Sequence, residues 1–426
     1  MVSSRLTAGQ RVNAFETAEV AVSYVLFDQP RAFRGPSRIW FGGRASQHIQ
    51  DCVQELGIRA GPALLVTDAV VDRLNLAGGV AEGLAGAGFE LHRFAEIPGE
   101  PSVEVADQAV ALARRFAPSL VVGVGGGSVL DVAKFSAAMT RNPGSVLDYT
   151  HLVGKRFAEA AVPTVLVPTT AGTGAEASQN AVVTAGARKA FANNHPQLLA
   201  AGVLLDPVLT YSLPPAVTAH TGLDALSHCL EGTLSTNATA LTDAVAAQGT
   251  ALIFGALRRA CAARTRPGAG VGEPLESSDP EARAQMLLAA YLGGLTLNAG
   301  MVLGHSIAYT LANRLHLPHG LSCAIALPYT LAYNRGAAPH RLAALDHAAG
   351  VAGGDIVAET ERLCRDVGIP VSVRSLGLER DRLPELVEEC VTQYPRPNNP
   401  RPLDRQALLA LYDAMWEGRP ASEWTG

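Results

Sequence analysis

The sequence predicts an N-terminal α/β domain with a parallel sheet, followed by an all-α C-terminal domain. Short apolar strands alternate with helical segments up to residue 212, and this order is typical of a parallel sheet with helices on both faces. After Pro215 the strand signals fade and helical periodicity dominates. We therefore expect an N-terminal extension (1–36), an α/β domain (37–212) and a helical domain (213–426).

The predicted strands of the α/β domain are short and apolar, as strands buried on both faces of a parallel sheet usually are. Another strand-like stretch, VAVSYVLF at 20–27, lies in the extension before the first core strand. Two core strands run directly into polar turns. The expected core strands are 38–43, 63–68, 89–94, 119–128, 164–170 and 203–207.

Helices are predicted where apolar residues recur at spacings of three and four. In the α/β domain, Ser102 is a good N-cap for a helix through Arg115. The segment 264–280 is rich in Pro, Gly and Ser, so we expect a surface loop there. The helices expected in the second domain are 224–231, 238–262, 282–299, 302–314, 342–349, 355–367, 383–391 and 405–416.

Composition restricts the class of protein. Of the 426 residues, 48% are hydrophobic and 17% charged, so the chain can bury a large core. The net charge of −5 gives no electrostatic reason to expect nucleic acid or an anionic membrane as a partner. The six cysteines lack CxxC spacing, which fits a reducing cytoplasm. We find no signal peptide and no apolar run long enough to predict a membrane helix.

A glycine-rich turn, GVGGGSVLDVAK, follows one of the predicted strands and leads into a helix. Gly125, Gly126 and Gly127 let backbone N–H groups approach a pyrophosphate at the start of that helix. Ser128 and Asp131 add polar side chains to this cradle. The alternative is a plain tight turn, because the GxGxxG spacing of ordinary Rossmann folds is absent.

Polar residues also follow two other strands of the predicted sheet. Asp68 ends its strand where a nucleotide-binding fold places an acid on the adenosine ribose, which favours NAD over NADP. The alternative is a helix N-cap. PTTAGTGAEAS, with Thr169, Thr170 and Thr173, can hydrogen-bond a nucleotide or phosphate. The alternative there is a structural loop with turns closed by threonine side chains.

Two segments of the helical domain supply residue types that bind metals. In DALSH, Asp224 and His228 are four apart and share one helical face. In GHSIAYTLANRLHLPHG, His305 and His319 are fourteen apart and return to nearly one face, although we expect Pro318 to break that helix. One carboxylate and three imidazoles suit a divalent metal such as Fe or Zn. The alternative is ordinary core or surface histidines, since the chain has eleven.

Taken in order, these segments resemble the iron-containing (group III) alcohol dehydrogenases, a family that includes lactaldehyde and maleylacetate reductases. GGGSVLDVAK and PTTAGTGAE match its cofactor segments, and DALSH and the later Pro-His-Gly match its metal motifs. The resemblance covers roughly residues 37–415. It implies an architecture shared with dehydroquinate synthases, in which 37–212 bind NAD(H) and 213–426 bind the metal.

The resemblance also assigns residues to roles. Asp224, His228, His305 and His319 are implied to bind a catalytic divalent metal, Fe(II) by the family name with Zn as the alternative, while His316 has no counterpart among the ligands. Asp68 is implied to select NAD. The residues implied to lie near the pyrophosphate or along the nucleotide are Gly125, Gly126, Gly127, Ser128, Asp131, Thr169, Thr170 and Thr173.

The sequence departs from the family pattern at three positions. Many members carry a further histidine four residues after the third ligand, and here that position is Tyr309. A tyrosine can donate a hydrogen bond or relay a proton, but is a poorer base at neutral pH. Glu100 stands where the family often has the asparagine of Pro-Asn-Pro. A lysine that usually follows the threonine-rich strand corresponds to Lys189, which we keep as a cofactor contact.

The resemblance implies reversible hydride transfer between NAD(H) and a small alcohol or aldehyde, chiefly as an aldehyde reductase. An acid-bearing aldehyde or oxoacid, like maleylacetate or phosphonoacetaldehyde, is the alternative substrate, and Asn313 and Arg314 would meet its acid group unless Arg314 is only a surface residue. A dehydroquinate synthase-like lyase or a non-enzymatic NAD-binding module is disfavoured by the complete motifs. We expect a cytoplasmic enzyme with a small-molecule substrate, and a homodimer is an open expectation.

Overall fold

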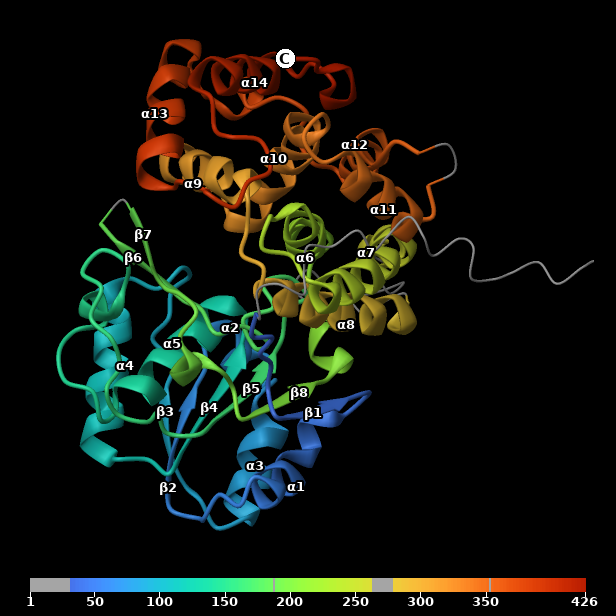
Figure 1. Cartoon of the computed structure of the whole chain (residues 1–426). Helices are drawn as coiled ribbons and strands as arrows, with labels where there is room; N and C mark the ends of the chain where they lie inside the picture. Colours follow the sequence, from blue (N-terminus) through green and yellow to red (C-terminus); the bar gives the residue numbers. More distant parts are fainter. Residues whose placement is uncertain (1–30, 187, 263–278, 352–353) are drawn as a thin grey trace, which may run out of the picture.

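The computed structural model describes residues 31–186, 188–262, 279–351 and 354–426. An α/β part built on a parallel sheet lies below a part made of helices (Figure 1). This arrangement confirms the predicted fold class. The strand-like stretch 20–27 and most of the predicted loop 264–280 lie outside the described residues.

The central sheet has six parallel strands in the order β1-β8-β5-β4-β2-β3. All six predicted core strands are present, each ending within a few residues of its expected bound. Because the strands are parallel, their carboxyl ends meet at one edge of the sheet. The strands are β1 (Arg38–Phe41), β2 (Pro62–Val66), β3 (Glu90–Phe94), β4 (Leu120–Gly125), β5 (Thr164–Pro168) and β8 (Gly202–Leu205).

Helices cover both faces of the sheet, and the alternation of side chains along β2 shows how. Ala63 and Leu65 belong to a core formed with α1 (Ile49–Glu55), α2 (Ala69–Arg73) and α3 (Gly78–Gly86). Leu64 and Val66 point to the opposite face, into the core formed with α4 (Val103–Phe116) and α5 (Gly127–Met139). Ser102 caps α4 as predicted. The second core continues into the helical part, so the two parts pack without a break.

An antiparallel hairpin that the sequence analysis missed extends from the sheet toward α9 (Figure 1). It consists of β6 (Ala181–Ala185) and β7 (Arg188–Ala192). Asp131 on α5 accepts a hydrogen bond from the backbone N–H of Val182 at 3.0 Å. The N–H of Thr184 donates to the carbonyl of Pro101 at 2.8 Å. These bonds fix the hairpin over the carboxyl edge of the sheet.

The helical part contains two departures from prediction. The first helix begins at Pro215 rather than at 224, and a complete helix from His319 to Asn334 was missed. Proline explains the second error: Pro318, which we expected to end a helix, is the N-cap of this one, and Pro328 lies inside it. The helices are α6 (Pro215–Leu234), α7 (Ala240–Cys261), α8 (Pro280–Thr296), α9 (Leu303–Leu315), α10 (His319–Asn334), α11 (Pro339–Ala349), α12 (Ile356–Asp366), α13 (Leu383–Gln393) and α14 (Arg405–Glu417).

One helix of the described residues, α7, is long and apolar enough to cross a membrane by length and composition. It packs between α6 and α8, and Ile253 and Leu257 on it are fully buried in the shared core. We therefore assign α7 as a core helix, and it does not indicate a membrane protein.

Candidate metal and cofactor site

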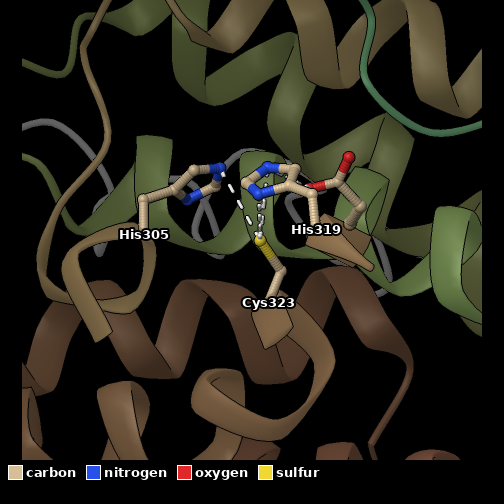
Figure 2. A group of neighbouring side chains, drawn as sticks. His305, His319 and Cys323 are labelled. Carbon is tan, nitrogen blue, oxygen red and sulfur yellow. Dashed lines mark hydrogen bonds and ion pairs between the residues drawn. The ribbon is translucent and has the colours of Figure 1, made fainter. Parts of the chain in front are cut away.

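The four predicted metal ligands come together from three helices. Asp224 and His228 lie one turn apart on α6, as predicted. His305 lies near the start of α9 and His319 is the first residue of α10 (Figure 2). The Oδ1 atom of Asp224 is 3.8 Å from His228 Nε2 and 3.6 Å from His319 Nε2. The rings of His228 and His305 stack with centroids 5.0 Å apart.

His305 and His319 lie on two different helices, so the expected break before Pro318 is present and the shared helical face is not. Helix α9 ends at Leu315, and His316 adopts a left-handed conformation there. Helix α10 then packs back against α9, which brings the two histidine rings to a centroid distance of 5.5 Å. Tertiary packing, not helical spacing, therefore brings these ligands together.

The donor atoms suit a divalent cation. Ligand atoms bound to one ion at about 2.0–2.3 Å lie roughly 3.3–3.8 Å apart in a tetrahedral arrangement, close to the separations from Asp224. Asp224 and His228 are both buried, and Asp224 Oδ1, which faces His228 Nε2 and His319 Nε2, has no hydrogen-bond partner among the described residues. Because buried polar atoms are nearly always paired, this oxygen is best explained by a ligand such as a metal ion.

Glu231 orients His305. Its Oε1 atom is 2.8 Å from His305 Nδ1, and its Oε2 atom accepts hydrogen bonds from the backbone N–H groups of Val302 and His305. With the Nδ1 edge engaged by Glu231, the Nε2 edge faces the cluster. Burial, together with the neighbouring histidines, holds the pKa of His305 well below its ordinary value, so the ring is neutral. Sequence analysis missed Glu231, although it follows His228 by three residues on the same helix.

A further donor, Cys323, was also missed. It lies one turn after His319 on α10, and its Sγ atom is 3.6 Å from His319 Nε2 and 4.0 Å from His305 Nε2 (Figure 2). The ligand atoms of Asp224, His305, His319 and Cys323 all lie within 4.8 Å of one another. The spacing of four in HGLSC was the available signal, because it puts the thiol on the helical face of His319.

The glycine turn and the threonine loop pack together at the carboxyl edge of the sheet. Strand β4 ends at Gly125 and β5 at Pro168, and these residues are partners in register. Gly126 caps α5. A Cβ atom on Gly127 would lie 2.7 Å from Thr173, so a side chain would fill the space beside the first N–H groups of the helix. Such a cradle at a helix N-terminus fits the pyrophosphate of NAD.

A cavity of about 230 Å³ joins this turn to the metal cluster. Helix α5, the hairpin, α6, α9 and α10 all contribute to its wall. Of the predicted residues, the wall contains Gly127, Ser128, Asp131, Thr173, Lys189, Asp224, His228, His305, Tyr309 and His319. Gly125, Gly126, Thr169 and Thr170 do not line it, and the Thr169 N–H donates to the Gly125 carbonyl at 2.9 Å.

Two predicted cofactor residues have structural partners within the protein. Asp68 Oδ1 accepts hydrogen bonds of 2.8 Å from two backbone N–H groups of α2, so Asp68 is the N-cap of that helix. Asp131 holds the hairpin, and its Oδ1 atom is 3.8 Å from the buried Lys134 Nζ. For Asp68 the simpler alternative of a helix cap is present, and a ribose contact would be an additional role.

Two residues singled out from the sequence meet in the structure. The ammonium group of Lys189 on β7 forms an ion pair with the carboxylate of Glu100, which lies before α4. Both line the cavity. Lys189 was predicted without this partner, so its charge is already balanced before any cofactor binds.

Tyr309 on α9 lies between the metal cluster and Tyr394, which directly follows α13. Its ring centroid is 5.6 Å from that of His319 and 5.0 Å from that of Tyr394. The hairpin contributes Phe191, whose ring centroid is 6.3 Å away. Burial raises the pKa of Tyr309 well above its ordinary value, so the side chain is a neutral phenol. It is suited to donating a hydrogen bond rather than to removing a proton.

The residues suggested for an acid-bearing substrate lie outside the cavity wall. Arg314 forms ion pairs with Glu385 at 3.3 Å and Glu389 at 3.5 Å, and the Asn313 amide donates to Glu389. The alternative that Arg314 is a surface residue therefore holds. A different arginine, Arg396, lines the cavity instead.

Models of the iron-containing alcohol dehydrogenase family match residues 36–207 and, for its C-terminal domain, 218–416. Long-chain-alcohol dehydrogenase 1 of Geobacillus thermodenitrificans is 36% identical, covering 86% of this chain and 92% of its own. A crystal structure of 1,3-propanediol oxidoreductase gives a TM-score of 0.82 at 29% identity, covering 91% of this chain and 100% of that one. Sulfoacetaldehyde reductase from Bifidobacterium kashiwanohense, in complex with NAD⁺, gives 0.79 at 27% identity, covering 91% and 99%.

A glycine cradle on a parallel sheet, joined by one cavity to a buried carboxylate and histidine cluster, defines a metal-dependent nicotinamide oxidoreductase. The family models together span most of the chain, and the chain belongs to the iron-containing alcohol dehydrogenase family. It is thus an NAD-dependent oxidoreductase of alcohols and aldehydes that uses a divalent metal. The predicted family, fold and reaction class are confirmed.

Proposed function

We propose that the protein works mainly as an aldehyde reductase, converting a small aldehyde and NADH to the alcohol and NAD⁺. The observation that carries this proposal is one continuous cavity, which brings the start of α5 and the metal cluster to a shared space. One similar protein is named for 1,3-propanediol, which is neutral, and another is named for sulfoacetaldehyde, which carries a sulfonate. The names of the relatives therefore leave the substrate class open.

On the metal side, we assign the ion to Asp224, His228, His305 and His319. A divalent ion there supplies a Lewis acid for the carbonyl oxygen. The protein prepares the site in advance: Glu231 holds the His305 ring in place, and burial keeps that ring neutral. A preformed ligand set needs little rearrangement when the substrate arrives.

On the cofactor side, NADH supplies the hydride, and the protein supplies position. We assign the pyrophosphate to the start of α5 at Gly126, Gly127 and Ser128, with Asp68 on the adenosine ribose. The free N–H groups of the first helical turn favour an anion there. The other assigned nucleotide contacts are Gly125, Asp131, Thr169, Thr170, Thr173 and Lys189.

We assign Tyr309 to the proton of the reaction. Reduction of an aldehyde requires one proton on the oxygen besides the hydride on the carbon. The phenol of Tyr309 is neutral and lies beside His305 and His319, so it can hold a hydrogen bond to the substrate oxygen and pass on a proton taken up from solvent.

Removing one ligand tests the assignment. We expect His305→Ala to lose bound metal and NADH-dependent aldehyde reduction together, each by more than about tenfold. The control is His316→Asn, which changes an exposed histidine outside the cluster and keeps a residue that tolerates left-handed backbone. Full metal occupancy with the wild-type rate in His305→Ala would refute the site. Net consumption of NADH also separates this reaction from a dehydroquinate synthase-like lyase, which regenerates its NAD.

We further propose that the enzyme is a cytoplasmic homodimer. The six cysteines are all unpaired, which fits a reducing compartment. Strand β1 is an edge strand on which Ile39 and Phe41 are 46% and 47% exposed, and a second copy could cover this edge. Light scattering after size-exclusion chromatography gives the mass in solution, and a monomer would refute the dimer.

A further inference from the structure

We propose that Arg396 selects aldehydes that carry an acid group, a carboxylate or a sulfonate, at the end opposite the carbonyl. This inference rests on the proposed function and names its substrate class. It moves the recognition of the acid from Arg314, which lies outside the cavity wall, to a residue that lines the cavity.

Arg396 lies at the metal end of the cavity. It belongs to the segment between α13 and α14, and its guanidinium carbon is 5.9 Å from the centroid of the Tyr309 ring. The other neighbours of that ring include His305 and His319, at centroid distances of 6.1 and 5.6 Å. A substrate with its carbonyl at the metal cluster therefore has the guanidinium within the reach of a short carbon chain.

The side chain of Arg396 is held on one edge and free on the other. Its Nε atom donates to Ser306 Oγ at 2.9 Å, and that hydroxyl donates to the Tyr394 carbonyl at 2.6 Å. Within the described part of the chain, the two terminal nitrogens form no hydrogen bond and no carboxylate lies within ion-pair distance. A fixed guanidinium with both terminal nitrogens free is the geometry that binds a carboxylate or sulfonate through two hydrogen bonds.

The other charges around the cavity are already balanced. Glu100 pairs with Lys189, Asp131 lies beside Lys134, and Asp224 lies beside His319 in the metal cluster. Burial raises the pKa of the Glu231 carboxyl, and the charge of Arg396 acts on it in the opposite direction. Glu231 already has partners, because its oxygens contact His305 Nδ1 and the His305 backbone N–H. A half-buried cation that has no carboxylate partner among the described residues raises the free energy of the empty enzyme. An acid group on the substrate would remove that penalty, whereas a neutral aldehyde would not.

Matched substrates and variants test the proposal in the metal-loaded enzyme. Butanal and 4-oxobutanoate have the same chain length and differ in the acid group, and acetaldehyde and sulfoacetaldehyde form a second pair. We expect the wild type to prefer the acid-bearing member in kcat/KM. In Arg396→Gln, the ratio of the two kcat/KM values should fall by about tenfold or more, mainly through KM of the acid. Arg314→Gln, which removes an arginine outside the wall, should keep the wild-type ratio.

The outcomes separate this inference from the proposed function. If no aldehyde consumes NADH, the proposed function fails. If NADH is consumed but Arg396→Gln keeps the wild-type ratio, Arg396 does not select the substrate and only the inference is overturned.

Metal content is measured in the same preparations. This measurement identifies the outcome in which Arg396 only offsets the charge of Glu231 and so keeps the metal bound. If Arg396→Gln loses metal, Arg396→Lys decides, because lysine keeps the charge but not the two-nitrogen fork. We expect this variant to retain metal with a ratio several-fold below wild type. A wild-type ratio would overturn the inference.

Discussion

Cys323 puts a soft sulfur atom beside a cluster otherwise made of nitrogen and oxygen donors. Thiolate ligands favour Zn, whereas imidazole and carboxylate also suit Fe. The distance of 3.6 Å from Sγ to His319 Nε2 is that expected between ligands of one ion, and the distance of 4.0 Å to His305 Nε2 is slightly longer. The balance between the two metals in this protein therefore depends on a residue outside the four-ligand motif.

We expect Cys323→Ser to lower the affinity for Zn relative to Fe by about tenfold, because a hard hydroxyl replaces the thiol. In the cobalt-substituted protein, the sulfur-to-cobalt charge-transfer band should disappear in this variant. Cys364→Ser is the control, since Cys364 is buried on α12 and donates to the carbonyl of Ala324. Identical cobalt spectra for wild type and Cys323→Ser would show that the thiol does not bind the ion.

Tyr309 is one of the positions at which this chain departs from its family, and its hydroxyl can be tested separately from its ring. We expect Tyr309→Phe to lower kcat by about a hundredfold while KM changes little, because the proton donor is lost and the ring packing is kept. Tyr394→Phe is the control: its ring lies beside Tyr309, but its hydroxyl accepts a hydrogen bond from Asn313. A wild-type kcat in Tyr309→Phe would remove Tyr309 from the proton path.

Single residues also mark the limit of prediction from sequence. The four metal ligands could be identified because each sits in a motif with characteristic spacing. Arg396 could not, because it lies far beyond His319, the last of the ligands in the sequence, on a segment without regular structure. Its nearness to Tyr309 results from its hydrogen bond to Ser306 and from the packing of α13 against α9.

At the scale of elements, a buried polar cluster ties α5 to the threonine loop and the hairpin. Lys134 Nζ donates to the Asn180 carbonyl at 2.7 Å and to Ser178 Oγ at 3.3 Å, and it is also influenced by Asp131 and Glu176. Burial raises the pKa of Glu176 to about 7 and that of Asp131 to about 6. The folded protein thus holds these protons at pH values where the unfolded chain has released them.

This cluster makes stability depend on pH. For a carboxyl whose folded pKa is raised, stability is full below the unfolded pKa and falls as pH rises through the folded one. For Glu176 the window runs from 4.5 to about 7, at about 1.4 kcal/mol per pKa unit. When the pH is raised from 5 to 8, Glu176→Gln should therefore lose less free energy of unfolding than the wild type. Denaturant unfolding at both values, with metal and NAD fixed, measures this. Equal losses in the two proteins would contradict it, while Asp131 leaves some dependence in both.

Strands and most helices were predictable because their apolar periodicity is local. Helix α10 and the hairpin were not, for different physical reasons. Helix α10 starts after Pro318 and contains Pro328, so propensity argues against it, while its buried face and tertiary packing stabilise it. The hairpin is held by bonds to Asp131 and Pro101 on distant segments, which no local pattern records.

At the scale of the whole molecule, the α/β part and the helical part touch backbone to backbone. Gly174 in the threonine loop has a φ of +58°, and a Cβ atom there would lie 2.4 Å from the Cα of Gly294 on α8. A Cβ on Gly294 would lie 2.3 Å from the Gly174 carbonyl oxygen. No side chain other than hydrogen fits at either position, so this contact fixes the distance between the cofactor loop and the helices.

We expect Gly294→Ala to lower the free energy of unfolding by about 1–3 kcal/mol and to raise KM for NADH, because the threonine loop must shift. Gly255→Ala is the matched control: it lies on α7, and a Cβ there meets nothing within 4 Å. That variant should be neutral or slightly more stable, since alanine favours a helix. Thermal unfolding and steady-state kinetics of both variants provide the check. Wild-type values in Gly294→Ala would show that the loop and the helix can accommodate a methyl group at this contact.

Sequence motifs indicated both halves of the site but not the space between them. The cavity forms because α9, α10 and the hairpin converge over the carboxyl edge of the sheet, and this convergence depends on contacts between residues far apart in the chain. The segment that carries Arg396 closes the same space. The substrate-binding surface is thus a property of the assembled molecule.

Any redesign of the coenzyme preference at Asp68 also has to preserve the start of a helix. The carboxylate that we assign to the ribose also caps α2 through its Oδ1 atom. Exchange for alanine, to admit the extra phosphate of NADP, would remove the cap and destabilise the protein by about 1 kcal/mol. Serine or asparagine would remove the negative charge and still accept the hydrogen bonds. A change of coenzyme preference to NADP should therefore cost less stability through serine or asparagine at position 68 than through alanine.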